Sequence, residues 1–114
     1  MTSSDRTIDP KALMSTLDEG EAVVLIDVRR KADYDADPQV IPNAAWKDPA
    51  LVSQWSEELP KDKKVIVYCV RGGSVSNSVV DHLLAKEVKA CYIQGGITAW
   101  KEQGGPLVKR EETL

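Results

Sequence analysis

The stretch that decides the fold reads VIVYCVRGGSV and covers residues 65–75. Its first four residues are apolar and mostly β-branched, which favours a strand, and a helical pattern begins at Ser74, after two glycines. The stretch therefore predicts a strand, a tight loop and a helix, with the thiol of Cys69 at the end of the strand. In such a loop, backbone N–H groups and the positive end of the helix dipole can form an anion-binding cup. We expect a thiol held there to lose its proton readily and to act as a nucleophile.

Strands and helices alternate on both sides of this stretch. Residues 22–28 are a short, nearly continuous apolar run, typical of a strand buried on both faces, and residues 90–93 predict a further strand. Helices are expected to begin after Asp9, after Asp48, at Ser74 and at Ile97. The chain is therefore expected to adopt an α/β fold, with a central parallel sheet covered by helices on both faces. Ligands of such sheets bind at the carboxyl ends of the strands, where Cys69 and Arg29 are both expected.

Composition and charge limit the classes of function. The 114 residues, 42% of them apolar, suit one domain over residues 1–114 with a charged tail at 107–114. A net charge of −3, with acidic and basic residues interspersed, argues against nucleic acid or a membrane as a partner. No apolar stretch is long enough to span a bilayer, and the first twenty residues contain no apolar core of a secretory signal. We therefore expect a cytoplasmic protein.

The two cysteines are expected to be free thiols. Cys69 ends one predicted strand and Cys91 begins another, so about four residues of strand separate them by roughly 13 Å. A disulfide requires Cα atoms within about 7 Å. Two free thiols suit a reducing cytoplasm. One histidine and two distant cysteines do not match zinc-ligand spacing, so no metal site is expected.

The candidate residues around Cys69 each have a structural and a functional interpretation. Cys69 is either a buried structural thiol or a nucleophile, and Arg71 is either solvated or binds a thiolate, a persulfide or an anionic substrate. Asp27 and Arg29 form either an ordinary loop ion pair or a brace for the Cys69 loop. Trp46 is either a core aromatic residue or lies at the mouth of the pocket. The only histidine, His82, lies eight residues after Ser74, or roughly 12 Å along the helix, and is expected at the surface, too far away to activate Cys69.

Three segments together resemble a known family. They are IDVR at 26–29, the Cys69 loop, and YIQGGITAW at 92–100. In this order they resemble the motifs of single-domain rhodaneses, and the resemblance extends over residues 9–106. One departure is QVIPNA at 39–44, where the family usually has Gly-His-Ile-Pro-Gly-Ala; Asn43 can replace glycine because Asn tolerates left-handed backbone conformations.

The resemblance implies a thiosulfate sulfurtransferase that needs no cofactor. Cys69 would be the catalytic residue and would carry the transferred sulfur as a persulfide, with Asp27 and Arg29 in support. The residues implied to bind the substrate follow it directly: Val70, Arg71, Gly72, Gly73, Ser74 and Val75. The donor would be thiosulfate or a persulfide, and the acceptor would be cyanide or a cellular thiol, including a thiol-carrying protein.

The residues themselves are also compatible with two other functions. Phosphatases and arsenate reductases on this fold have loops that resemble His-Cys-x5-Arg. Here Tyr68 precedes the thiol and Val75 occupies the place of the arginine that would grip a phosphate bidentately. A non-enzymatic persulfide carrier or binding module is the other alternative. Thiosulfate:cyanide transfer and aryl phosphate hydrolysis would discriminate among these functions.

Overall fold

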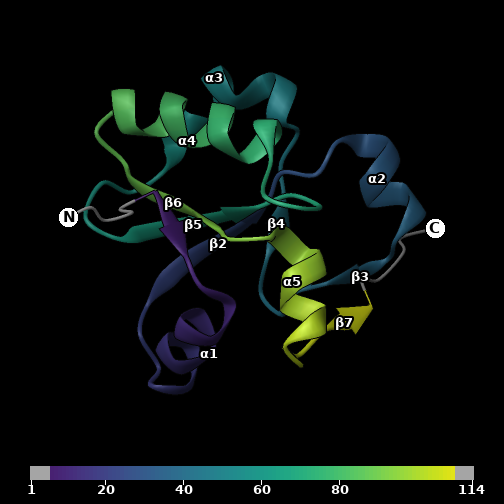
Figure 1. The fold of residues 1–114 in the computed structure, drawn as a ribbon. Helices are drawn as coiled ribbons and strands as arrows, with labels where there is room; N and C mark the ends of the chain where they lie inside the picture. Colours follow the sequence, from purple (N-terminus) through teal and green to yellow (C-terminus); the bar gives the residue numbers. More distant parts are fainter. Residues whose placement is uncertain (1–5, 110–114) are drawn as a thin grey trace.

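The computed structural model describes residues 6–109 and contains a five-stranded, entirely parallel sheet in the order β1-β6-β5-β2-β4 (Figure 1). The strands are β1 (Thr7–Ile8), β2 (Val23–Asp27), β4 (Ala45–Trp46), β5 (Lys64–Tyr68) and β6 (Lys89–Ile93). Strand β5 is central, and all of its residues after Lys64 are buried. The predicted parallel sheet is confirmed.

Helices cover both faces of this sheet (Figure 1). On one face lie α3 (Val52–Trp55) and α4 (Ser74–Ala85), and on the other lie α1 (Pro10–Asp18) and α5 (Gly96–Glu102). Because side chains alternate along a strand, β5 contributes to two cores. Val65 and Val67 pack on the α4 side, whereas Ile66 and Tyr68 pack on the side of α1 and α5.

The helix starts follow the predicted signals. The Asp9 carboxylate accepts a hydrogen bond from the Lys11 N–H at 3.0 Å, and Pro10 occupies the first helical position of α1. Helix α4 begins at Ser74, as expected from the two glycines before it. The first turn of α4 thus lies at the carboxyl edge of the sheet, and the helix begins five residues after Cys69.

The segment after Asp48 differs from the expected single helix. It forms three short pieces: the 3-10 helix η1 (Pro49–Leu51), α3, and the 3-10 helix η2 (Ser56–Glu58). The Trp55 indole N–H donates to the Asp48 carbonyl at 2.8 Å, which ties the segment back to its own start. This tight winding places η1 beside the first turns of α4.

Two short strands outside the main sheet were not predicted, and a short helix follows β2. Strand β3 (Gln39–Val40) pairs antiparallel with β7 (Val108–Lys109), and α2 (Lys31–Ala36) follows β2. Strand β7 lies within the stretch predicted to be a charged tail, whose residues 110–114 lie outside the described residues. Within residues 6–109, no helix is long and apolar enough to span a membrane.

Candidate active site

Cys69 follows the last residue of β5 and lines a pocket of about 190 Å³ at the carboxyl edge of the sheet. Its side chain is mostly enclosed, with 6% of the residue exposed. The pocket is lined by Arg29, Arg30, Asp33, Cys69, Val70, Arg71, Gly73, Ser74 and Val75. The structure thus brings together most of the predicted site residues. Asp27 and Gly72 do not line the pocket.

Gly72 lets the loop pack tightly against the turn between β6 and α5. Its φ is +71°, a left-handed conformation that L side chains rarely adopt. A Cβ added there would lie 3.0 Å from the Gly95 nitrogen and 3.1 Å from the Ile93 carbonyl oxygen. Glycine at this position therefore satisfies both the backbone conformation and a close backbone approach.

The first amides of α5 hold the carbonyl groups of the loop. The Ile97 N–H donates to the Cys69 carbonyl at 3.0 Å, and the Thr98 N–H donates to the Val70 carbonyl at 3.1 Å. In a trans peptide the C=O and the following N–H point in opposite directions. Holding these two carbonyls against α5 therefore turns the next two N–H groups of the loop away from α5.

This holding role was not assigned from the sequence. The sequence predicted a strand at 90–93 and a helix from Ile97, and the resemblance added a family motif at 92–100, but neither indicated a contact with the Cys69 loop. A Cβ on Gly96 would lie 2.5 Å from the carbonyl oxygens of both Cys69 and Val70. The absence of a side chain at Gly96 lets α5 approach the loop.

The loop presents unused hydrogen-bond donors. Within residues 6–109, the N–H groups of residues 71–75 have no protein acceptor, and no side chain caps the start of α4. Donors of this kind at a helix N-terminus favour an anionic group beside them. They are close in sequence to Cys69, and all of these residues except Gly72 line the same pocket.

Arg29 and Asp27 form a buried ion pair, which we call the brace, and not a solvated loop pair. Both Arg29 and Asp27 are 1% exposed, and the Asp27 carboxylate accepts hydrogen bonds from Arg29 Nε and Nη2 at 3.0 and 2.8 Å. Burial alone would lower the pKa of Arg29, but the hydrogen bonds and the charge of Asp27 outweigh it and raise that pKa.

The brace also joins β2 to its surroundings. Arg29 Nη2 donates to the Gln39 carbonyl at 3.2 Å, and the Arg29 carbonyl accepts from Trp46 Nε1 at 2.8 Å. The Trp46 ring stacks on Tyr34 with centroids 5.0 Å apart. Trp46 does not line the Cys69 pocket, and its indole contacts the Arg29 backbone and the Tyr34 ring instead.

Arg30 was missed by the sequence analysis. It lies next to the brace, is exposed, and lines the Cys69 pocket together with Arg71. The only signal for it was its position two residues after the end of a predicted strand. The pocket thus has two exposed arginines and one acidic side chain, Asp33, at its wall.

The remaining candidates lie elsewhere. Cys91 pairs with Ile66 in the middle of β6 and belongs to the other core cluster from Cys69, and both cysteines are free thiols as expected. Burial raises the pKa of the Cys91 thiol. His82 does not line the Cys69 pocket; it is half-buried rather than a surface residue, and its Nε2 is enclosed without a hydrogen-bond partner among the described residues. Residues 6–109 contain no cluster of side chains suited to a metal ion.

Comparisons with known proteins agree with this architecture. The family of rhodanese-like domains matches residues 9–103. A sulfurtransferase of Allochromatium vinosum is 32% identical over 105 residues, which cover 91% of this chain and 95% of that protein. Thiosulfate sulfurtransferase GlpE of Coxiella burnetii is 38% identical over 80 residues, covering 69% of this chain and 72% of that protein. A rhodanese-related protein of Thermoplasma volcanium has a crystal structure with a TM-score of 0.78 at 26% identity, covering 90% of this chain and 97% of that one. The chain belongs to the family of rhodanese-like domains.

Proposed function

We propose that this protein is a sulfurtransferase that takes sulfane sulfur from thiosulfate onto Cys69 and passes it to a thiophilic acceptor. The observation that carries the proposal is the placement of the Cys69 thiol in a small pocket beside unused backbone N–H donors and two exposed arginines. Anions are favoured in such a pocket, and thiosulfate, sulfite and a persulfide are all anionic. Similarity to sulfurtransferases supports the same reaction class.

The first half-reaction is a displacement at sulfur. The Cys69 thiolate attacks the outer sulfur of thiosulfate, a new S–S bond forms, and the S–S bond of thiosulfate breaks. Sulfite leaves with the electron pair of that bond, and Cys69 becomes a persulfide anion. The N–H groups of residues 71–75 would stabilise the negative charge on the outer sulfur.

The second half-reaction regenerates the enzyme. A cyanide ion or a thiolate attacks the outer sulfur of the persulfide, and the bond to the Cys69 sulfur breaks with its electrons returning to Cys69. The products are thiocyanate or an organic persulfide. The two halves form a ping-pong sequence through a covalent intermediate, with no external oxidant or reductant.

Intact-protein mass spectrometry after thiosulfate treatment tests this proposal. We expect a gain of one sulfur atom that maps to the Cys69 peptide and disappears on adding cyanide. Cys69→Ser should abolish both the gain and thiosulfate:cyanide transfer. Transfer that persists in Cys69→Ser, or sulfur that maps to Cys91, would contradict the assignment.

Cys91 provides an internal control for reactivity. Because burial raises the pKa of the Cys91 thiol, its thiolate should form only at high pH, and iodoacetamide should label it slowly at neutral pH. Cys69 lies beside the unused N–H groups of residues 71–75, which favour an anion, and should be labelled first. A pH series of labelling, read by peptide mapping, measures the order.

The same assays separate the alternative functions. A phosphatase would hydrolyse an aryl phosphate, and we expect no such activity because Val75 offers no charge to a phosphate. A persulfide carrier would acquire sulfur on Cys69 but would not turn over with thiosulfate and cyanide. Multiple turnovers with both small molecules would support the enzyme.

A further inference from the structure

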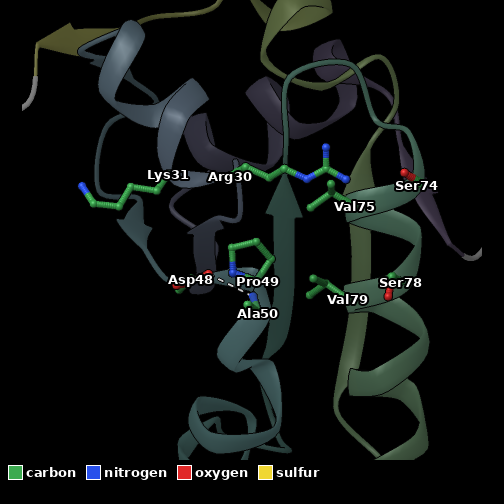
Figure 2. A pocket seen from close by; sticks show the side chains of 9 residues that line it. All are labelled: Arg30, Lys31, Asp48, Pro49, Ala50, Ser74, Val75, Ser78 and Val79. Carbon is green, nitrogen blue, oxygen red and sulfur yellow. Dashed lines mark hydrogen bonds between the residues drawn. The ribbon is translucent and has the colours of Figure 1, made fainter.

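A second, larger cavity lies beside the Cys69 pocket. It has a volume of about 460 Å³ and shares Arg30, Ser74 and Val75 with the smaller pocket, so the two spaces adjoin (Figure 2). Its other walls come from η1 and from the second turn of α4, where Pro49 faces Val79. We call this space the η1–α4 groove.

The two spaces suit molecules of different sizes. A pocket of about 190 Å³ accommodates a small inorganic anion, whereas cavities of about 300–1,000 Å³ are typical for small organic ligands. Cyanide as acceptor would leave the η1–α4 groove unused. An organic thiol could place its sulfur at Cys69 and the rest of its structure in the groove.

The charge nearest to the junction of the two spaces is that of Arg30. Figure 2 shows its side chain extended toward Val75, at the start of α4. Among residues 6–109, no side chain forms an ion pair or hydrogen bond with Arg30. An unpaired guanidinium beside an open cavity favours a ligand carboxylate, which it can bind through two parallel hydrogen bonds.

The other charged groups of the groove are already engaged. Lys31 points away from the groove in Figure 2, and its ammonium pairs with Asp35 at 2.9 Å. The Asp48 carboxylate accepts the Ala50 N–H at 3.0 Å and caps η1. Among the charged residues that line this groove, Arg30 is therefore the one whose charge is available to bind a ligand.

We propose that the η1–α4 groove is the acceptor subsite and takes a carboxylate-bearing organic thiol, with Arg30 determining this specificity. The proposal rests on the persulfide mechanism proposed above. In the step concerned, the acceptor thiolate attacks the outer sulfur of the Cys69 persulfide, the S–S bond to Cys69 breaks, and its electrons return to Cys69. The acceptor leaves as an organic persulfide, and its carboxylate is unchanged.

A matched pair of acceptors tests the proposal. Persulfidated protein is mixed with N-acetylcysteine, which has a carboxylate, or with N-acetylcysteine amide, which is neutral. Loss of sulfur from the Cys69 peptide is followed by rapid quenching and mass spectrometry, and each rate is divided by the thiolate fraction of its acceptor. We expect the carboxylate form to discharge the persulfide roughly three- to tenfold faster, the range expected for a charged but partly solvated hydrogen bond.

Variants of Arg30 test whether this residue causes the preference for the acceptor that has a carboxylate. Arg30→Gln should reduce the ratio of the two rates to about one, and Arg30→Glu should reverse it. Lys31→Gln is the matched control: it removes a neighbouring positive charge that points away, and the ratio should stay as in the unmodified protein. The ratio is independent of any effect of Arg30 on thiosulfate loading, because loading precedes the measured step.

Ala50→Leu tests the groove itself. Ala50 is exposed on the groove wall and does not line the Cys69 pocket, so a larger side chain narrows only the groove. We expect the rate with N-acetylcysteine to fall relative to the rate with cyanide.

Two results would overturn the acceptor subsite: equal rates with both acceptors in the unmodified protein, or a carboxylate preference that survives Arg30→Gln. Failure of the mechanism is a separate result, since thiosulfate would then add no sulfur to Cys69. In that case inorganic polysulfide loads the thiol instead, and the same discharge ratio still decides the role of Arg30.

Discussion

Three arginines line the Cys69 pocket, and they differ in burial and in ion pairing. Arg29 is buried and its charge is matched by Asp27, so it contributes rigidity more than an attractive charge. Arg30 lies between the pocket and the η1–α4 groove. Arg71 belongs to the loop itself, is exposed, and has no ion-pair partner among residues 6–109. We therefore expect Arg71 to act mainly on the donor anion.

Arg71→Ala should weaken the use of thiosulfate without destabilising the fold. A charged hydrogen bond contributes about 1.5–3 kcal/mol, so kcat/KM for thiosulfate should fall roughly ten- to a hundredfold. The melting temperature should stay nearly unchanged, because no packing is lost at an exposed loop position. Arg71→Lys should recover only part of the rate, since an ammonium replaces a planar fork. Normal kinetics in Arg71→Ala, or early unfolding, would show that Arg71 has no role in donor binding.

Individual residues of the site were predictable to different degrees. Cys69 and the loop after it were identified because their chemistry depends on a local pattern of strand, glycines and helix. The burial of Arg29 could not be predicted from the sequence, because an Asp and an Arg two residues apart form either a solvated or a buried ion pair. Arg30 was missed because its importance depends on the neighbouring groove, whose other wall comes from η1, about twenty residues later in the chain.

At the scale of elements, the position of the Cys69 loop depends on α5. The amides of Ile97 and Thr98, in the first turn of α5, donate to the Cys69 and Val70 carbonyls, and Gly96 makes this approach sterically possible. Helix α5 thus orients the peptide groups of a loop that precedes it by more than twenty residues. This arrangement explains why a pair of glycines follows β6.

Gly96→Ala should destabilise the protein and disturb the loop. Its φ is +63°, and the added Cβ would lie 2.5 Å from two carbonyl oxygens that have no room to move. Gly104→Ala is the matched control, because Gly104 has φ +81° but open space around its missing Cβ. We expect Gly104→Ala to lower the free energy of unfolding by about 1–2 kcal/mol, the usual strain of a left-handed residue.

Gly96→Ala should lower the free energy of unfolding by the same amount as Gly104→Ala and, through overpacking, by about 1–3 kcal/mol more. It should also lose thiosulfate:cyanide transfer, whereas Gly104→Ala should keep it. Urea unfolding and steady-state assays measure the two effects. Equal losses of stability and activity in both variants would show that the contact between α5 and the loop is not under steric constraint.

The longer helices and strands were predicted from the sequence better than the short ones. Strands β2, β5 and β6 and helices α1 and α4 carry either apolar runs or cap residues, and all were predicted near their observed bounds. The two-residue strands β1, β3 and β7 were missed, since two residues are too short to show a period. The segment from Pro49 to Glu58 was predicted as one helix because its apolar spacing is helical, but the contacts of Trp55 wind it more tightly.

At the scale of the whole molecule, one acidic residue joins parts that are distant in sequence. The Asp37 carboxylate pairs with Lys101 of α5 at 2.6 Å and lies 3.7 Å from Arg29 Nη1. It also accepts the Gln39 N–H at 3.0 Å, at the start of β3. Asp37 therefore connects the brace behind the Cys69 pocket with the helix that holds the Cys69 loop.

This connection should depend on pH in a defined direction. Burial alone would raise the pKa of Asp37, but hydrogen bonds from Lys101 and the Gln39 N–H, with the charges of Lys101 and Arg29, outweigh it and lower that pKa. A carboxyl whose pKa is lower in the folded state stabilises the fold above its unfolded pKa. That stability is lost as the pH falls through the folded pKa.

A double-mutant cycle with Asp37→Asn and Lys101→Gln measures the connection. The coupling free energy should be about 0.5–1 kcal/mol near pH 7, the upper part of the range for partly exposed ion pairs. It should shrink as the pH falls through the lowered folded-state pKa of Asp37, because the carboxylate then takes up a proton and loses its charge. Asn at position 37 can still accept the Gln39 N–H, so the cycle isolates the charge interaction from the hydrogen bond that starts β3. A coupling that stays constant as the pH falls through this range would mean that Asp37 is joined to Lys101 of α5 by hydrogen bonding alone, and that the charge of Asp37 does not contribute to the connection.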